Sequence, residues 1–554
     1  MSEQPVRTDG HPQPLRRGNA AWEPAGIVSP WLRATVALLV LLGIFFRAYR
    51  LDYKVFWEDE ILGTLHMQGY TEAEVVKASP RLIEALDVQR YLHVPRRDGD
   101  RPLWATVRSL AVEDPQHPPL YYLAARLWTQ LFGTSAAAVR SLSTVFGVIA
   151  LPCVYWLCLE LFGSTETALV ALALFALSPF YVLYAQEARE YSLWTVVVLL
   201  DALLLLRASR STARSPWIAY GVLTALGLYV YPLTGLVALG FGAYLIFRER
   251  LRPTSVVRRW AVATLAAFAA FAPWLNVMAS SHGLERGMAG IVRGNLSALA
   301  TFEIFARDLR APFFDLGQFR VDGLSSTVVN LPLTIVVVAL CAYALAALVR
   351  DRPFTVWGFV VTALCIPMVV LVLIDLVRHG HFVYQARYFI PLLLGVQLSV
   401  ASLLAAAIQN KAAGSVARNV WLAAFAVILA GEAASCIIAA RADTWWNKDY
   451  ERSRSVAEIV NHAPRPIVVS DYFSPSILAL SFYLDPNVPL RLNLKCGQCV
   501  ETETVRSNKV RSTTGFDTVF TLQAAEPASA ERSEWIDPLP FPPRPRPLNM
   551  FLSI

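Results

Sequence analysis

Three adjacent carboxylates, Glu58, Asp59 and Glu60, follow an apolar segment and are flanked by Trp57 and Ile61. Like charges this close raise one another's pKa, and burial adds to the effect, so one of them could act as a general base. Charge runs of this kind are also typical of a solvated acidic helix end. The residues alone leave both interpretations open.

A second motif begins at His117 and reads His-Pro-Pro-Leu-Tyr-Tyr. Its two prolines end an extended segment and open a helix that reaches Phe132, because proline suits the first helical turn. This helix is apolar on one face and too short to cross a bilayer, so we expect it at a membrane interface. His117 at its beginning could hold an anionic group, and a solvated histidine is the alternative.

A third motif runs from Ser178 to Ser192 and joins two apolar segments. Polar and charged groups in such a tight connection are costly unless they are paired or take part in binding or catalysis. This favours a functional role for the motif. The planar guanidinium of Arg189 suits a phosphate. The motif's candidate site residues are Gln186, Glu187, Arg189 and Tyr191.

A fourth cluster contains His379 and His381 and is followed by Arg387 and Tyr388. Arg387 lies at the beginning of an apolar segment, where its charge could neutralise a phosphate. Two histidines resemble a metal pair, but two ligands without a third make a weak zinc site. We therefore predict no metal site here.

The composition shows which elements must position these residues. Of 554 residues, 55% are hydrophobic and 16% are charged, with a mean hydropathy of +0.44, whereas soluble proteins carry roughly 25% charged residues. This excludes a soluble enzyme, a disordered scaffold and a disulfide-stapled secreted domain. Segments of about 20 apolar residues predict membrane-spanning helices. We expect eleven: 31–50, 136–160, 166–184, 190–206, 216–230, 233–247, 260–278, 329–349, 355–376, 386–408 and 419–440.

The distribution of basic residues predicts the orientation of these spans. With the N-terminal tail, residues 1–30, in the cytoplasm, the predicted inner loops hold twelve basic residues and the short outer turns hold only two, Arg189 and Arg378. This bias orients membrane proteins and accounts for much of the net charge of +7. Binding to nucleic acid is therefore not needed to explain that charge. The twelve are Arg207, Arg210, Arg214, Arg248, Arg250, Arg252, Arg258, Arg259, Arg350, Arg352, Lys411 and Arg418.

The same topology places three longer pieces outside: loops at about 51–135 and 279–328, and a C-terminal domain over 441–554. Strand-like and helix-like segments alternate in that domain, which predicts a small α/β module with a Pro-rich tail. Cys496 and Cys499 would lie outside, where they could form a disulfide or stay a free pair. The predicted fold class is thus a polytopic all-α membrane protein with a small extracytoplasmic α/β domain.

All four motifs fall on the outer side in this topology, as expected for a membrane enzyme with an external substrate. A transporter or flippase of lipid-linked glycans is the alternative, but it would place ionisable groups at mid-bilayer. The acids that we identify within spans are Asp201 and Asp375, and both lie near a span end. Transport is therefore the weaker hypothesis, and a noncatalytic subunit that retains the fold is a third.

The motifs together resemble the GT-C glycosyltransferases, and within them the bacterial protein-mannosyltransferase-like group of family 39. The resemblance rests on Trp57-Glu-Asp-Glu60, on His117-Pro-Pro-Leu-Tyr-Tyr and on Ser178-Pro through Gln186-Glu-Ala-Arg-Glu-Tyr-Ser192. It covers about 31–240 well and continues more loosely through Arg387-Tyr388 to Lys448-Asp449. It implies transfer of a sugar from a polyprenyl-phosphate donor to a glycan, lipid or protein acceptor, on the outer side of the bacterial cytoplasmic membrane.

The resemblance also implies roles for individual residues. Asp59 would be the catalytic base or would position the acceptor, with Glu60 as its partner, and either Arg189 or Arg387 would bind the lipid phosphate. Relatives often carry a histidine after the Gly-Leu-Tyr of the fifth span, which this chain lacks at 227–231. No cofactor is certain, and a divalent metal ion stays possible because some members use one. The residues expected around the substrates are Glu58, His117, Gln186, Glu187, Arg189, Tyr191, Arg387 and Tyr388.

Overall fold

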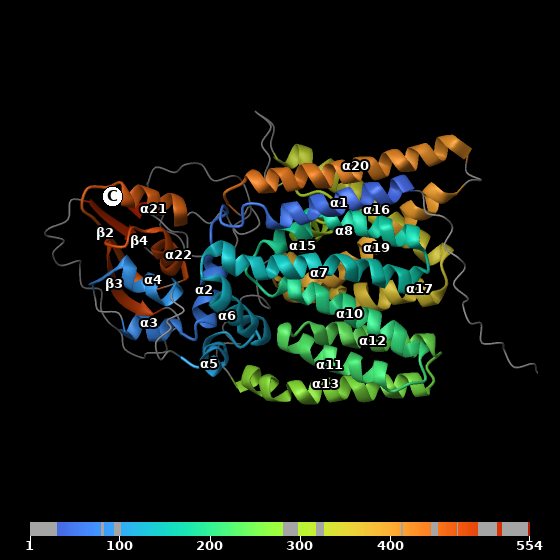
Figure 1. The fold of residues 1–554 in the computed structure, drawn as a ribbon, viewed down its shortest axis with the longest axis horizontal. Coiled ribbons are helices and arrows are strands. Elements are labelled where there is room, and N and C mark those ends of the chain that lie inside the picture. Colours follow the sequence, from blue (N-terminus) through green and yellow to red (C-terminus); the bar gives the residue numbers. More distant parts are fainter. Residues whose placement is uncertain are drawn as a thin grey trace, which may run out of the picture.

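A bundle of long helices and a smaller α/β unit at one end of it make up the chain (Figure 1). The computed structural model describes residues 30–78, 82–93, 101–280, 297–316, 326–410, 414–444, 453–473, 475–496, 518–522 and 552–553. Four predicted features lie outside these residues: most of the N-terminal tail, the Lys448-Asp449 pair, Cys499 and the Pro-rich tail.

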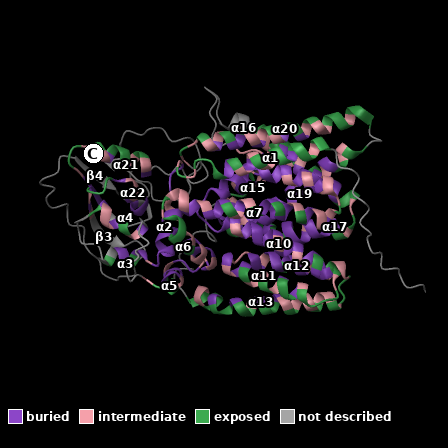
Figure 2. Ribbon diagram, viewed as in Figure 1, coloured by how far each residue is buried: buried purple, intermediate pink, exposed green. Residues whose placement is uncertain are grey.

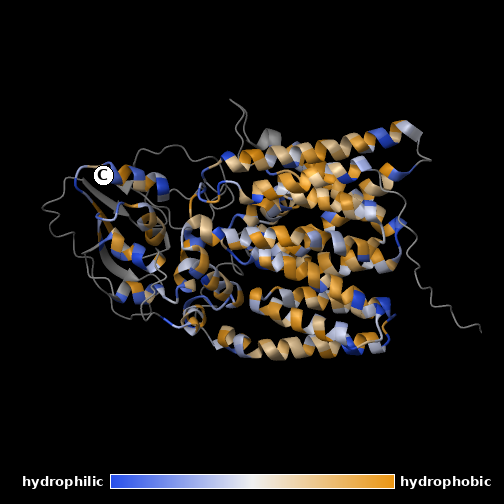
Figure 3. Ribbon diagram, viewed as in Figure 1, coloured by the Kyte–Doolittle hydropathy of each residue, from blue (hydrophilic) through white to orange (hydrophobic). Residues whose placement is uncertain are grey.

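Each of the eleven predicted spans contains helical residues of the bundle, because each is a long apolar segment whose backbone must be hydrogen-bonded internally in lipid. Figure 3 shows that hydrophobic residues dominate these helices. The helices are α1 (Pro30–Ala48), α7 (Ala136–Phe162), α8 (Thr165–Leu177), α9 (Pro179–Ala185), α10 (Tyr191–Arg210), α11 (Ser215–Val230), α12 (Thr234–Arg248), α13 (Ser255–Ser280), α16 (Ser326–Asp351), α17 (Phe354–Gly358), η1 (Phe359–Cys365), α18 (Ile366–Arg378), η3 (Ala386–Phe389), α19 (Ile390–Gln409) and α20 (Gly414–Arg441).

Eight helical segments of the described chain are long and apolar enough to cross a membrane, and the bent pair α8–α9 makes up to nine. The apolar helices α11 and α12 are shorter than this test requires. The polytopic, mainly helical fold is thus confirmed, whereas the count of eleven crossings stays a prediction. Helices α10 and α19 are mostly buried, and α1, α13 and α20 expose most of their surface at the edge of the bundle (Figure 2).

The α8–α9 pair bends by 57°, and buried side chains satisfy the backbone at the bend. The last carbonyls of a helix have no partner within it. At the end of α8, Arg47 of α1 donates to the carbonyls of Phe175 (3.0 Å) and Ala176 (2.6 Å), and Cys436 of α20 donates to that of Leu177 (3.2 Å). The bend therefore fixes the direction of α9, which leads into the turn at 186–190.

The α/β unit contains a five-stranded sheet of order β1-β3-β2-β4-β5. Strands β3 and β4 pair parallel to the central β2, and the edge strands β1 and β5 pair antiparallel. The strands are β1 (Leu82–Glu84), β2 (Pro466–Phe473), β3 (Pro489–Cys496), β4 (Thr518–Leu522) and β5 (Leu552–Ser553), and the unit's helices are α3 (Glu72–Ala78), α4 (Ala85–His93), α21 (Ser453–Asn461) and α22 (Pro475–Tyr483).

Strand β1 comes from the first long loop and not from the C-terminal segment. Ile83 pairs with Leu490 of β3, and Gln89 of α4 donates to the carbonyls of Ser481 and Leu484 (both 2.8 Å). The α/β unit is therefore built from two distant parts of the chain, which the predicted boundary at 441 does not capture. The boundaries 1–30, 31–440 and 441–554 stay predictions.

Between the sheet and the bundle lie α2 (Glu58–Met67), α5 (Leu103–Glu113) and α6 (Leu120–Phe132) (Figure 1). Helix α6 buries Tyr121, Tyr122 and Ala125 and exposes Leu127 and Leu131, as expected of the amphipathic helix predicted after His117. Two further elements, α15 (Ala298–Arg310) and η2 (Phe382–Tyr384), contact each other beside α18. These short elements surround the end of the bundle where the four sequence motifs meet.

Candidate active site

The carboxylate run lies at the beginning of α2. Trp57 has extended backbone angles and precedes the helix, so Glu58, Asp59 and Glu60 form its first turn. Carboxylates are favoured there because the first N–H groups of a helix are unpaired and carry partial positive charge. The backbone N–H of Trp57 lies 3.4 Å from Oε2 of Glu60, which stabilises the start of the helix.

Glu60 is fully buried and forms an ion pair with Arg140 of α7. Arg140 Nε donates to Glu60 Oε1 at 2.8 Å, and Arg140 Nη2 donates to Oε2 at 2.6 Å. The backbone N–H of Ala188 also donates to Oε1, at 2.8 Å. Both oxygens are therefore engaged, and Glu60 ties α2 to α7 and to the turn at 186–190.

Arg140 was not among the site residues predicted from the sequence. It lies a few residues inside an apolar segment, where a charge is costly unless it is paired, and this position could have indicated a buried ion pair. Besides Glu60, Arg140 donates to three backbone carbonyls that precede α2, those of Leu51 (2.7 Å), Lys54 (3.0 Å) and Val55 (2.8 Å). Arg140 therefore holds three positions of the connection between α1 and α2.

Asp59 is the carboxylate that faces the second arginine. Its side chain is 33% exposed, and Oδ2 lies 3.3 Å from Nη2 of Arg387, a residue of η3. The guanidinium of Arg387 also lies over the ring of Tyr191, 5.0 Å from its centroid, and 5.8 Å from that of Trp57. Rings beside a cation hold it in place. A partly exposed carboxylate thus sits next to a cation whose position is fixed.

Arg189 lies beneath Asp59 and is buried. Its Nη1 donates to the backbone carbonyl of Asp59 at 3.1 Å, and its Nη2 lies 2.7 Å from Nε2 of His117. Glu190, which is also buried, approaches Arg189 Nε at 3.4 Å. Arg189 is therefore engaged by protein groups and supports the backbone of Asp59.

His117 has three charged neighbours. Its Nε2 lies 2.7 Å from Nη2 of Arg189 and 3.5 Å from Oε1 of Glu190. Nδ1 lies 2.7 Å from Oδ2 of Asp114 and donates to it. Burial alone would raise the pKa of the Asp114 carboxyl, but the facing His117, with His66 and Arg189, lowers it well below its ordinary value. Asp114, His117 and Arg189 thus form a continuous chain that ends at Asp59.

Gln186 and Glu187 begin the turn after α9. Gln186 Nε2 donates to the carbonyls of Phe46 (2.7 Å) and Tyr49 (3.1 Å), so it holds the end of α1. Glu187 is fully buried and close enough to Arg387 to interact with it electrostatically. The turn therefore connects α1, α2 and η3, which explains why its polar residues sit between apolar helices.

Glu58 lies within electrostatic range of an acid in the first loop, Glu72. Burial raises the pKa of Glu72 to about 8, and the charges of Glu113, Glu58 and Asp114 add to the effect. Glu113 accepts from the backbone N–H groups of Glu72 (2.7 Å) and Ala73 (3.0 Å) at the beginning of α3. Glu58 therefore lies close enough to Glu72 to act on it electrostatically, whereas Asp59 contacts Arg387.

Tyr388 extends the aromatic surroundings of Arg387. Its ring lies 6.0 Å from that of Tyr231, which in turn lies 5.7 Å from that of Tyr191. Tyr231 belongs to the segment 227–231, where the expected histidine is missing. The structure thus brings Tyr191 and Tyr388 together with Arg387.

The described residues contain no group of three or more His, Cys, Asp or Glu side chains arranged to hold a metal ion. His381 is buried and His379 is exposed. Asp375 accepts from the backbone N–H groups of Phe382 (3.0 Å) and Val383 (2.7 Å), so it stabilises the loop before η3.

Two acidic residues lie deeper in the bundle. Both carboxylate oxygens of Asp201 lie within 3.1 Å of the Thr224 hydroxyl. Glu432 of α20 is fully buried within a span, and sequence analysis did not identify it. Among the described residues, neither carboxylate oxygen of Glu432 has a hydrogen-bond partner.

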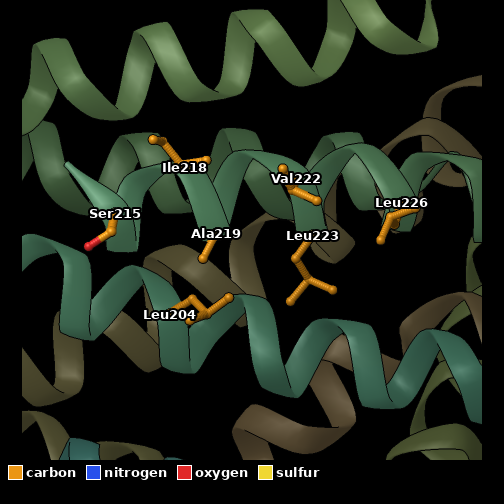
Figure 4. Close-up of a pocket in the computed structure, with 7 residues that line it drawn as sticks. All are labelled: Leu204, Ser215, Ile218, Ala219, Val222, Leu223 and Leu226. Carbon is orange, nitrogen blue, oxygen red and sulfur yellow. The ribbon is translucent and has the colours of Figure 1, made fainter.

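A groove of about 480 Å³ lies between α10 and α11, away from these residues (Figure 4). It contains none of the ten candidate residues, and a single hydroxyl, that of Ser215, is its polar side chain. Such a groove offers no group for proton transfer, so we do not place the reaction there. Its lining residues are Leu204, Ser215, Ile218, Ala219, Val222, Leu223 and Leu226.

Residues 116–276 match the family model described as dolichyl-phosphate-mannose-protein mannosyltransferase. This range contains His117 and the turn at 186–190, and it excludes Asp59 and Arg387. No curated protein matches the sequence. The match covers less than a third of the chain, so it shows what this part of the chain is similar to.

Three solved structures are similar to the chain at low identity. ArnT from Cupriavidus metallidurans bound to undecaprenyl phosphate is 11% identical, with a TM-score of 0.48 over 83% of this chain and 86% of that one. The Archaeoglobus fulgidus oligosaccharyltransferase AglB with an inhibitory peptide and a dolichol-phosphate is 11% identical, with a TM-score of 0.42 over 78% and 58%. The Saccharomyces cerevisiae Pmt1-Pmt2 complex bound to the sugar donor is 14% identical, with a TM-score of 0.32 over 46% and 34%.

Proposed function

From the family match and the geometry around Asp59, we propose that the chain transfers a sugar from a polyprenyl-phosphate donor to an acceptor hydroxyl, with Asp59 as the catalytic base. The observation that carries the proposal is the partly exposed carboxylate of Asp59, 3.3 Å from the guanidinium of Arg387. The reaction needs one group to take a proton and one to balance a leaving phosphate, and this pair supplies both.

The proposed step is a single displacement. Asp59 Oδ takes the proton of the acceptor hydroxyl while the acceptor oxygen forms a bond to the anomeric carbon. The bond between that carbon and the phosphate oxygen breaks, and its electron pair leaves with the polyprenyl phosphate. The proton then passes from Asp59 to solvent, which its 33% exposure permits. The product has the inverted configuration at the anomeric carbon.

We assign the phosphate to Arg387 and not to Arg189. Arg189 is 2% exposed, and its two terminal nitrogens already contact His117 and the carbonyl of Asp59. The side chain of Arg387 is 9% exposed and lies 3.3 Å from the carboxylate of Asp59, beside the ring of Tyr191. A cation held in place before the reaction stabilises charge that develops on the leaving group.

Glu60 acts as a positioning residue in this proposal, since both of its oxygens are engaged by Arg140. His117 supports Arg189 and lies at the rim of the same site. Family members act on polyprenyl-phosphate sugars at the outer face of the membrane. We therefore place the reaction on the extracytoplasmic side of a bacterial cytoplasmic membrane, as the basic inner loops predict.

The test is transfer of a labelled sugar from synthetic polyprenyl-phosphate sugar by purified Asp59→Asn protein in lipid nanodiscs. We expect turnover to fall at least a hundredfold at unchanged donor binding, since general-base catalysis contributes roughly 10²–10⁴. Asp351→Asn, at an exposed aspartate at the end of α16, is the matched control and should keep full activity. Full activity of Asp59→Asn would remove Asp59 as the base, and substrate movement without a new glycosidic bond would favour a transporter.

A further inference from the structure

The connection between α1 and α2 is held by residues that lie after α20 in the chain. The backbone N–H of Phe56 donates to the hydroxyl oxygen of Tyr483 at 2.6 Å. The preceding N–H, that of Val55, donates to the carbonyl of Asp443 at 2.8 Å. Two consecutive backbone groups just before α2 thus depend on the C-terminal part of the chain.

Arg454 of α21 holds two further positions of the same connection. Its Nη1 donates to the carbonyl of Tyr53 at 2.6 Å, and its Nη2 lies 3.3 Å from that of Asp52. The guanidinium of Arg454 also lies 5.1 Å from the ring centroid of Tyr483, so the two side chains support each other. Together they contact three of the five residues from 52 to 56.

Apolar packing joins the same elements. Helix α22 packs against α2, and the ring of Phe482 lies 5.2 Å from that of Phe56. Ile61 of α2 and Leu478 of α22 are buried in one hydrophobic cluster. Because protein interiors are densely packed, a displacement of α22 would be transmitted to the first turn of α2.

We infer that the C-terminal α/β unit is part of the catalytic apparatus, with Tyr483 and Arg454 as positioning residues that set the place of Asp59. The inference rests on the proposed function of Asp59. Arg140 holds residues 51, 54 and 55 from the bundle, and the α/β unit holds 52, 53 and 56. Asp59, three residues after Phe56, is thus positioned by the helical bundle and by the α/β unit together.

The consequence for catalysis is large because the base must meet a hydroxyl bound elsewhere. A misplacement of about 1 Å from a distant mutation can cost about a hundredfold in rate. Loss of the Tyr483 contact frees the N–H of Phe56 and lets the first turn of α2 shift relative to Arg387. The donor site at Arg387 is not changed by this shift, so turnover is affected more than donor binding.

The first test measures kcat and KM for donor with Tyr483→Phe in nanodiscs. We expect kcat to fall about tenfold to a hundredfold and the donor KM to stay within about twofold. Tyr244→Phe is the matched control, since it also deletes one hydroxyl bond, from α12 to the carbonyl of Thr355 in α17 at 3.1 Å. Wild-type kcat in Tyr483→Phe would overturn the inference.

The second test needs no substrate. Hydrogen–deuterium exchange of the peptide that contains Phe56 should be faster in Tyr483→Phe and in Arg454→Gln than in the wild type, with exchange of α10 unchanged. Exchange of this peptide at the wild-type rate in both variants would also overturn the inference. If Asp59→Asn keeps activity, the proposed function fails. If Asp59→Asn loses activity while both α/β variants behave as wild type, only the inference fails.

Discussion

Arg387 lies 3.3 Å from the carboxylate of Asp59 although the two residues are 328 positions apart. Asp59 begins a short helix after the first span, and Arg387 begins the span formed by η3 and α19. Neither residue lies within the range that matches the family model. The pair is therefore a property of the assembled bundle, and each member can be tested separately.

Replacement of Arg387 by Gln should lower kcat about a hundredfold, because loss of one preorganised group that stabilises a developing anion costs roughly 10²–10³. Arg387→Lys should recover part of this loss, since it keeps the charge without the planar fork. The measurement is sugar transfer from polyprenyl-phosphate sugar. Arg378→Gln removes an exposed arginine from the end of α18 and should leave kcat unchanged. Equal activity of Arg387→Gln and wild type would remove Arg387 from the phosphate site.

Arg140→Gln should lower the unfolding temperature in detergent more than Glu60→Gln does. Both variants break a buried ion pair, and removal of one partner costs about 3–5 kcal/mol. Arg140 also donates to three carbonyls, which its loss leaves without a partner. The control is Arg207→Gln, which breaks an ion pair with Glu160 whose arginine is half exposed and should cost less than about 1 kcal/mol. A larger effect for Glu60→Gln than for Arg140→Gln would contradict the conclusion that Arg140 stabilises more of the structure than its ion pair with Glu60.

Glu72 should make stability depend on pH. Its pKa is raised to about 8, chiefly by burial, so the folded chain binds this proton more tightly than the unfolded chain. The stabilisation is complete below the ordinary glutamate pKa near 4.5 and is lost as the pH rises through about 8. Each pKa unit corresponds to about 1.4 kcal/mol, so the effect amounts to a few kcal/mol.

Glu72→Gln should therefore flatten the fall in unfolding temperature between pH 5 and 8. The gain over the wild type should be greatest above pH 8 and smallest at pH 5, as measured by thermal unfolding across that range. Glu84→Gln, at an exposed position of β1, should follow the wild-type curve. If both variants show the same pH dependence as the wild type, Glu72 does not titrate as its surroundings indicate.

The sequence predicted the helical bundle because long apolar segments have few other structures available in lipid. It also predicted that the motifs at 57–60, 117 and 186–191 would lie at the same face of the membrane, since alternating spans bring their connections to the same end. The partners of these motifs could not be predicted. Glu60 pairs with Arg140 only because α7 packs beside the connection that precedes α2, and no local pattern records that packing.

The α/β unit shows the same limit. Its strands β2, β3 and β4 were visible as short apolar runs between turn residues. Strand β1 has three residues and joins β3 from about 400 positions away, so it carries no periodic signal of its own. Glu432 was missed for the opposite reason, because a single acid does not interrupt the strong apolar pattern of α20.

A substitution of Glu432 can distinguish the sugar-transfer hypothesis from the transport hypothesis. It is fully buried, and in the described part of the chain its two oxygens have no hydrogen-bond partner. Such a group costs about 1–3 kcal/mol, so Glu432→Met should raise the unfolding temperature in detergent. If the chain is a transferase with its site at Asp59, transfer should stay at the wild-type rate. Ala434→Met, on the exposed face of α20, controls for the change in volume.

A transporter would give a different result, because ionisable groups within spans are the ones that transport uses. Glu432→Met would then abolish movement of a fluorescent lipid-linked glycan across a proteoliposome membrane while the protein stays folded. Asp201→Asn should behave in the same way under that hypothesis, since Asp201 of α10 is also a fully buried acid within a span. Loss of activity in these two variants, with full activity in Asp59→Asn, would replace the transferase proposal by the transport one.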